Sequence, residues 1–183
     1  GDLSKVFNSF DIHRFDVWGM TDSYAGFKGY SKNGDYHIQS YFLVFNHAAI
    51  SCMYKYLADQ KFNLNYNSKK LNEKELRIKV IVNCEIGLSK HLSEFGLSLG
   101  VAFPTTKYIT RDEFDVNKIN PTDHLWKELI FDGFPLIKKK IVNGYLNNCL
   151  VQDIPIDTSS WYDSVKENAE SDERLDAIFK EFL

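Results

Sequence analysis

Residues 37–45, His-Ile-Gln-Ser-Tyr-Phe-Leu-Val-Phe, carry the strongest β-strand pattern in this chain. A strand with one face in water alternates apolar and polar residues, but the second half of this run is apolar at every position. Aromatic and β-branched side chains also favour an extended backbone. We therefore expect a strand that is buried on both faces. Such a strand constrains the chain to a fold in which a sheet lies between other layers.

Strand and helix patterns alternate along the rest of the chain. Further strands are expected at residues 15–20 and 97–103, and loops at the glycine-rich residues 24–36 and the polar residues 63–72. The expected helices run from the cap Asn46 to about Leu57, from Asn72 to Gly96 with a break near 81–83, from the cap Asp123 to Gly133, and across 160–183. This order predicts a single α/β domain over residues 1–183, with 142–183 as a C-terminal helical extension.

Composition excludes several classes of protein. The 183 residues are 44% hydrophobic and 26% charged, which is typical of a globular domain and not of a disordered or fibrous protein. The net charge of −3 and the small number of arginines give no general attraction to nucleic acid, so no nucleic-acid partner is expected. The three cysteines are too widely spaced for a disulfide framework or a zinc motif. No apolar run approaches the length of a membrane span.

The segment Gly96–Gly100 matches G-x-S-x-G, the nucleophile motif of α/β-hydrolases. In those enzymes a strand precedes the serine and a helix follows it. The predicted order here is the reverse, with a helix before the segment and a strand after it. We therefore interpret Ser98 as a turn residue and not as a nucleophile.

Three polar features are candidates for a functional site. Glu85 stands at the expected start of a helical segment, as a carboxylate that stabilises the helix dipole or as a base at the edge of the sheet. Gln39 and Ser40 follow His37 at the start of the buried strand. A buried amide costs free energy unless it is hydrogen-bonded, so Gln39 indicates either a structural network or a polar ligand such as a sugar. Lys138 begins a run of three lysines, which is either a solvated face or a phosphate clamp.

Several segments, in their order along the chain, resemble the rhamnan synthesis protein F family of bacterial polysaccharide and lipopolysaccharide glycosyltransferases. They are residues 16–22, 37–45, 85–89, 126–130 and 133–138. The resemblance implies a GT-A-like nucleotide-sugar fold, in which helices flank a mixed sheet. Such enzymes usually hold a divalent metal, Mn²⁺ or Mg²⁺, and the donor diphosphate with an Asp-x-Asp-type motif. They deprotonate the acceptor hydroxyl with a carboxylate at the start of a helix.

The resemblance also implies roles for individual residues. Glu85, followed by Leu88 and Gly96, is similar to the E-D-x-x-L…G segment of inverting GT-A enzymes and would be the general base. Ile86 stands where the aspartate of that segment would be, so the role of Glu85 stays open. The expected substrate contacts are His37, Gln39 and Ser40 on sugar hydroxyls, Trp18 and Trp126 stacked on a sugar face, Lys138 or His124 at the diphosphate, and Asp22 near the donor.

One departure from the family pattern concerns the donor half of the fold. Donor-binding strands and metal carboxylates normally precede the segment that contains Trp18, and Asp16 and Asp22 do not form an Asp-x-Asp motif. Residues 1–7 already fit a helix, which is typical of a chain that starts inside a longer protein. We therefore expect a piece that lacks the N-terminal donor-binding part, with the metal ligands outside it.

The expected function is a glycosyltransferase that transfers a sugar, such as rhamnose, from a nucleotide-sugar donor to a growing cell-surface polysaccharide. Its acceptor would be a glycan or lipid-linked glycan, and it would act in the cytoplasm at the inner face of the membrane. The alternative is a non-catalytic glycan-binding or scaffolding module of a polysaccharide-assembly protein. A third interpretation is an interaction domain that uses the apolar stripe Leu175, Ile178, Phe179 and Phe182.

Overall fold

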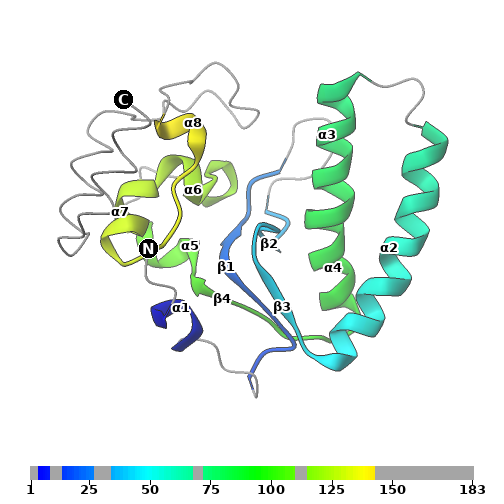
Figure 1. Ribbon diagram of the computed structural model, residues 1–183, viewed down its shortest axis with the longest axis horizontal. Coiled ribbons are helices and arrows are strands. Elements are labelled where there is room, and N and C mark those ends of the chain that lie inside the picture. The colour runs from blue at the N-terminus through cyan, green and yellow to red at the C-terminus, as the bar shows by residue number, and fades with distance from the viewer. Residues whose placement is uncertain (1–3, 9–13, 27–33, 68–71, 110–114, 143–183) are drawn as a thin grey trace.

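The computed structural model describes residues 4–8, 14–26, 34–67, 72–109 and 115–142, and within these ranges strand β1 (Val17–Ser23) organises the sheet (Figure 1). It pairs antiparallel with β2 (His37–Ile38) and β3 (Leu43–Phe45), and parallel with β4 (Leu99–Phe103). All of β1 is buried. The α/β class expected from the sequence is therefore confirmed, in the form of a mixed sheet with helices.

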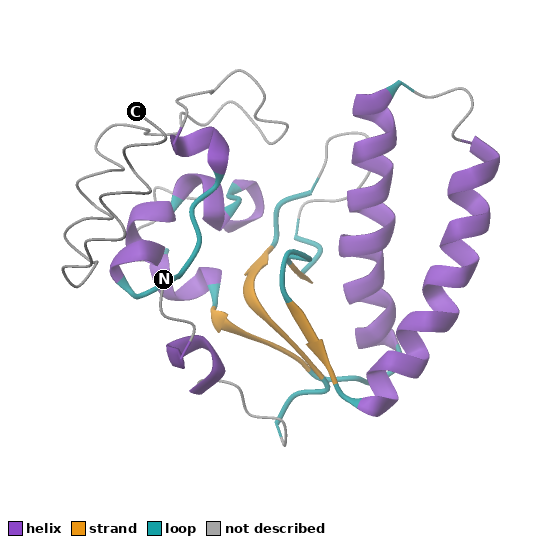
Figure 2. Ribbon diagram, viewed as in Figure 1, coloured by secondary structure: helices purple, strands orange, loops and turns teal. Residues whose placement is uncertain are grey.

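The sheet lies between two groups of helices (Figure 2). One group consists of α2 (His47–Asn67), α3 (Glu73–Ile81), the π-helical turn η2 (Val82–Ile86) and α4 (Gly87–Glu94). The other consists of α1 (Ser4–Asn8), α5 (Thr105–Tyr108), α6 (Pro121–His124), α7 (Trp126–Phe131) and α8 (Lys139–Val142), and a 3₁₀ turn η3 spans Val116–Lys118. The helical extension predicted for 142–183, with its apolar stripe, lies outside the described residues from 143 onward.

Successive side chains of β1 point to opposite faces of the sheet and build two hydrophobic cores. Val17 packs on one face in a cluster with Leu88 and Leu92 of α4. Trp18 packs on the other face in a cluster with Leu129 and other large apolar residues. The strand that is buried on both faces is thus β1, whereas residues 43–45 are only half-buried.

The single strand predicted for residues 37–45 is wrong, because the structure divides it into β2 and β3. On β1, the paired residues Gly19 and Asp22 are separated by two residues, but their partners Leu43 and Ile38 are separated by four. We call the intervening residues 39–42 the strand break. The aromatic residues Tyr41 and Phe42 within it still favour an extended chain, so the residue pattern alone did not reveal the interruption.

The helical column α3–η2–α4 follows the prediction closely. It starts after Asn72, as predicted, and Asn72 and Glu75 form a capping box there; Gly96 ends it in the left-handed conformation with φ of 78°. The break predicted near 81–83 is present as the π-helical turn η2, Val82–Ile86. A π turn inside an α-helix is rare and is frequently found at functional sites.

Two predicted helix boundaries are wrong. The side chain of Asn46 caps α2 by accepting the N–H of Ala49, as expected, but α2 continues to Asn67 and takes up part of the predicted loop 63–72. No glycine or proline interrupts residues 46–67, and the moderate helix propensities of the polar residues there do not stop a helix once it has started.

Asp123 is not the helix cap that the sequence suggested. Asn120 fills that position, since its side chain accepts the N–H of Thr122 and Pro121 starts α6. Asp123 lies inside α6 and is buried, while Leu125 separates α6 from α7. The predicted end of the segment at Gly133 is confirmed by its φ of 94°.

Asp16 joins the starts of three elements. One oxygen of its carboxylate accepts the N–H and the hydroxyl of Ser98 at 2.8 and 2.7 Å, just before β4, and the other accepts the side chain of Asn46, just before α2. These bonds lower the pKa of Asp16 below its usual value, and the bond from the Ser98 N–H has the largest effect. Ser98 lies after the turn at Phe95 and Gly96, in the short connection between α4 and β4, and its N–H and hydroxyl are both bonded to Asp16.

Replacing Gly19 with alanine should destabilise the fold at the strand break. A Cβ atom on Gly19 would meet the side chain of the buried Ile38 and lie 3.2 Å from the Phe42 carbonyl oxygen, so strand and side chain must both shift. We expect Gly19→Ala to lower the free energy of unfolding in urea by about 1–3 kcal/mol. The control Ser93→Ala, at an exposed position of α4, should change it by less than about 0.5 kcal/mol. Equal stability of both variants would contradict the packing described here.

Candidate functional site

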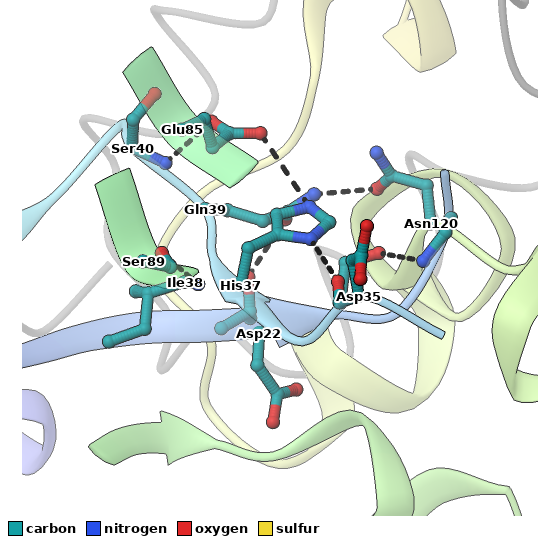
Figure 3. A network of polar contacts seen from close by, with 12 residues as sticks. Asp22, Asp35, His37, Ile38, Gln39, Ser40, Glu85, Ser89 and Asn120 are labelled. Carbon is teal, nitrogen blue, oxygen red and sulfur yellow. Dashed lines mark hydrogen bonds and ion pairs between the residues drawn. The ribbon is translucent and has the colours of Figure 1, made fainter. Parts of the chain in front are cut away.

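Glu85 projects from the π-helical turn η2 toward the strand break (Figure 3). Its Oε2 accepts the backbone N–H of Ser40 at 2.8 Å. Its Oε1 lies 3.8 Å from Nε2 of His37, a distance that suits an ion pair with a protonated imidazole but is too long for a hydrogen bond. The side chain of Glu85 is 17% exposed, so the carboxylate has an anchored oxygen and remains within reach of solvent.

The helical column α3–η2–α4 supplies hydrogen-bond acceptors for the backbone of β2 and of the residues that follow it. Ser89, four residues after Glu85, accepts the N–H of Ile38 at 3.1 Å through its hydroxyl oxygen, while Glu85 accepts that of Ser40. Backbone N–H groups that find no strand partner need another acceptor when they are shielded from water. Glu85 therefore has a structural contact as well as a candidate chemical role.

The helix-start position assumed for Glu85 in the sequence interpretation is wrong. Helix α3 leads into the π turn η2 without a gap, and η2 leads into α4, so Glu85 stands in the middle of a helical column. Glu85 is therefore not stabilised by the dipole of a helix N-terminus. Its carboxylate is stabilised by the hydrogen bond from the Ser40 N–H.

His37 is buried, at 3% exposure, with carboxyl groups near its ring. Its Nδ1 lies 3.0 Å from the backbone oxygen of Asp35, and a carbonyl only accepts, so we place a proton on Nδ1. Its Nε2 is the atom that faces Glu85. Asp22, also 3% exposed, accepts the N–H of Thr105 at 2.6 Å. Burial raises the pKa of Asp22, against the lowering effects of the Thr105 bonds and of the His37 charge.

Gln39 belongs to a second polar network. Its Oε1 accepts the hydroxyls of Thr21 at 2.8 Å and of Thr122 at 3.3 Å, and its Nε2 donates to Oδ1 of Asn120 at 3.1 Å. Of the two alternatives left open by the sequence, the structural network is present. Protein groups bond both the oxygen and the nitrogen of this amide.

Lys138 and His124 lie close to the same network. Nζ of Lys138 is 2.8 Å from the buried carboxylate of Asp123 and 3.4 Å from Oδ1 of Asn120. Nδ1 of His124 contacts the backbone of Asn120. The structure thus brings the two predicted diphosphate-binding residues together. The negative charge of Asp123 offsets the positive charge of Lys138, so this pair presents little net charge to an anion.

The two predicted sugar-stacking residues lie inside the protein. Trp18 is 1% exposed and packs in the core on one face of the sheet. Trp126 is 4% exposed and packs against Ile130, Ile137 and Ile141. The candidate site developed below therefore includes neither ring.

Tyr41 is the residue that the sequence analysis missed. Its hydroxyl is hydrogen-bonded to that of Thr21, and its ring meets Phe134 edge-on at 6.2 Å. Burial raises the pKa of Tyr41 despite the Thr21 bond, and the Glu85 and Asp22 carboxylates raise it further. A signal was available, because a tyrosine in a buried run needs a partner for its hydroxyl.

Groups of the kind that hold metals were also sought. Within the described ranges, no three or more His, Cys, Asp and Glu side chains gather where they could bind a metal ion. No helix in the same ranges has both the length and the apolar composition that crossing a membrane requires.

Comparison with known proteins gives one finding. The family model described as rhamnan synthesis protein F matches residues 2–179, which is nearly the whole chain. No curated protein and no solved structure matches this sequence.

The buried carboxyl of Asp22 should make stability depend on pH. Because its pKa is raised above 3.8, the folded protein binds this proton more tightly than the unfolded chain does. That contribution is complete below about pH 4 and is lost as the pH rises through the folded-state pKa. We expect Asp22→Asn, whose amide oxygen can still accept the Thr105 N–H, to gain stability relative to the wild type between pH 3.5 and pH 7. Urea denaturation at both pH values measures this, and a constant or falling difference would contradict it.

Proposed function

The chain belongs to the rhamnan synthesis protein F family, whose name refers to polysaccharide synthesis, and on this premise we propose that it is a glycosyltransferase with Glu85 as its general base. The observation that carries the proposal is the geometry of that carboxylate. Oε2 is fixed by the Ser40 N–H, and Oε1 lies on the side of His37 in a partly exposed position. A general base needs a fixed orientation and access to the proton that it accepts.

The reaction needs one proton transfer at this residue. An acceptor hydroxyl attacks the anomeric carbon of a nucleotide-activated sugar, such as rhamnose, and the bond from that carbon to the diphosphate breaks. The hydroxyl proton passes to Oε1 of Glu85, and the diphosphate leaves with the bonding electrons.

The donor side of the reaction is proposed from the family resemblance. A GT-A-like fold and a Mn²⁺ or Mg²⁺ ion at the donor diphosphate remain part of the proposal. The described residues lack a group of ligands that fits such an ion, so no step is assigned to it. The nucleotide-sugar donor, the glycan or lipid-linked glycan acceptor, and a place at the cytoplasmic face of the inner membrane are likewise proposed.

A non-catalytic glycan-binding or scaffolding module is the second candidate. One observation favours it. The side chains of Glu85 and Gln39 already have structural hydrogen-bond partners within the protein. A module of this kind would bind glycan without binding a nucleotide.

Replacing Glu85 with glutamine separates the two candidates. The amide oxygen of Glu85→Gln can still accept the Ser40 N–H, so the fold should persist, but the base is lost. We expect the rate of sugar transfer by the full-length protein to fall by about 10²–10⁴-fold, because general base catalysis contributes that much. Glu94→Gln, at an exposed position of α4, is the matched control and should keep wild-type activity.

Two results would contradict the catalytic proposal. One is near-wild-type transfer by Glu85→Gln. The other is the absence of any thermal stabilisation of the full-length protein by nucleotides or nucleotide sugars, with and without Mn²⁺, while a rhamnose oligosaccharide does stabilise it. Ligand at about 100 times its Kd should add about 2.7 kcal/mol of stability, so binding would be readily detected.

A further inference from the structure

Tyr41 combines an exposed ring with an anchored hydroxyl. The residue is 42% exposed, although it lies in a largely apolar run. The Thr21 hydroxyl donates its single proton to Oε1 of Gln39, so in the bond between Tyr41 and Thr21 the tyrosine is the donor. The polar end of Tyr41 is therefore held inside the protein, and what it shows to solvent is ring.

Neighbouring residues fix the orientation of this ring. The buried ring of Phe134 supports it edge-on, and Thr21, which is fully buried, holds its hydroxyl. A side chain that is already ordered loses little conformational entropy when a ligand packs on it. The strand break thus presents Tyr41 as a preformed aromatic surface.

The polar groups beside Tyr41 define the chemistry of a ligand. The preceding residue, Ser40, is exposed, and its N–H holds Glu85. The bond of Glu85 to the Ser40 N–H, at 2.8 Å, places a partly exposed carboxylate beside the residue that precedes Tyr41. Negative charge at this position disfavours a phosphate or nucleotide. It favours an uncharged ligand with hydroxyl donors, since carboxylates accept hydrogen bonds strongly.

We propose that Tyr41 is the stacking platform of an acceptor-sugar subsite, on which a neutral pyranose ring of the glycan packs its C–H face. The negative face of an aromatic ring attracts weakly positive C–H groups. Ser40, which precedes Tyr41, and Glu85, which accepts the Ser40 N–H, are the polar groups that we assign to the hydroxyls of this sugar. The assignment of this sugar as the acceptor rests on the proposed function of Glu85, whereas glycan binding by Tyr41 can be tested without it.

Isothermal titration of the full-length protein with a rhamnose oligosaccharide tests the subsite without requiring transfer. We expect Tyr41→Ala to weaken binding by roughly tenfold, the upper range of an aromatic packing contact. Tyr41→Phe, which keeps the ring, should bind nearly as the wild type does. Tyr41→Leu keeps apolar volume against Phe134 but has no aromatic face. It should also lose roughly tenfold in affinity, and it replaces Tyr41→Ala as the test if the alanine variant folds poorly. Tyr54→Ala, at a 68% exposed tyrosine of α2, is the control and should have no effect.

The outcomes separate this inference from the proposed function. Unchanged oligosaccharide binding by Tyr41→Leu, or no binding by the wild type, overturns the subsite. If Glu85→Gln still loses transfer in that case, the catalytic proposal stands alone. If Tyr41→Leu loses glycan binding while Glu85→Gln keeps full transfer, the subsite stands and Glu85 is not the base. If Tyr41→Leu instead binds a nucleotide sugar more weakly than the wild type does, and binds the oligosaccharide equally well, the ring belongs to the donor site and the proposal is overturned.

Discussion

The hydrogen bond between the Ser40 N–H and Glu85 connects the sheet of this protein to its candidate site. At the start of the strand break, Gln39 donates its N–H to Thr21 of β1, whereas the N–H groups of Ile38 and Ser40 on either side of it are bonded to the helices and not to β1. The helical column α3–η2–α4 supplies the acceptors, with Glu85 and Ser89 on successive turns. Because this contact orients the Glu85 carboxylate, the same interaction that completes the strand also positions the proposed base.

The strand break has a second consequence on its other side. It directs Gln39 inward, where Thr21, Thr122 and Asn120 satisfy its amide, and leaves the ring of Tyr41 facing solvent. Thr21 links the two, since it accepts from Tyr41 and donates to Gln39. An aromatic surface and a carboxylate are therefore held at the same break, the first by the bond to Thr21 and the second by the Ser40 N–H. A preorganised arrangement of this kind costs little to order when a glycan binds.

Local signals were enough to predict much of the fold. The helix start at Asn72 and the helix end at Gly96 depend on nearest neighbours, and the structure has them. The division of 37–45 depends on the pairing with β1, a tertiary contact that a single sequence does not display. The length of α2 and the cap at Asn120 have local causes, but competing local signals, the polar residues 63–72 and the carboxylate of Asp123, pointed elsewhere. Sequence chemistry singled out His37, Ser40 and Glu85, which do come together. It missed Tyr41, whose role follows from an anchored hydroxyl and an exposed ring.

The most direct test of this account is amide hydrogen exchange at Ser40, followed by NMR in the wild type and in Glu85→Ala. The account predicts that the Ser40 N–H is protected in the wild type and exchanges much faster in Glu85→Ala. The Ile38 N–H, which Ser89 holds, should stay protected in both proteins. A Ser40 N–H that exchanges as rapidly in the wild type as an open amide would contradict the account, because Glu85 would then not be anchored at the strand break.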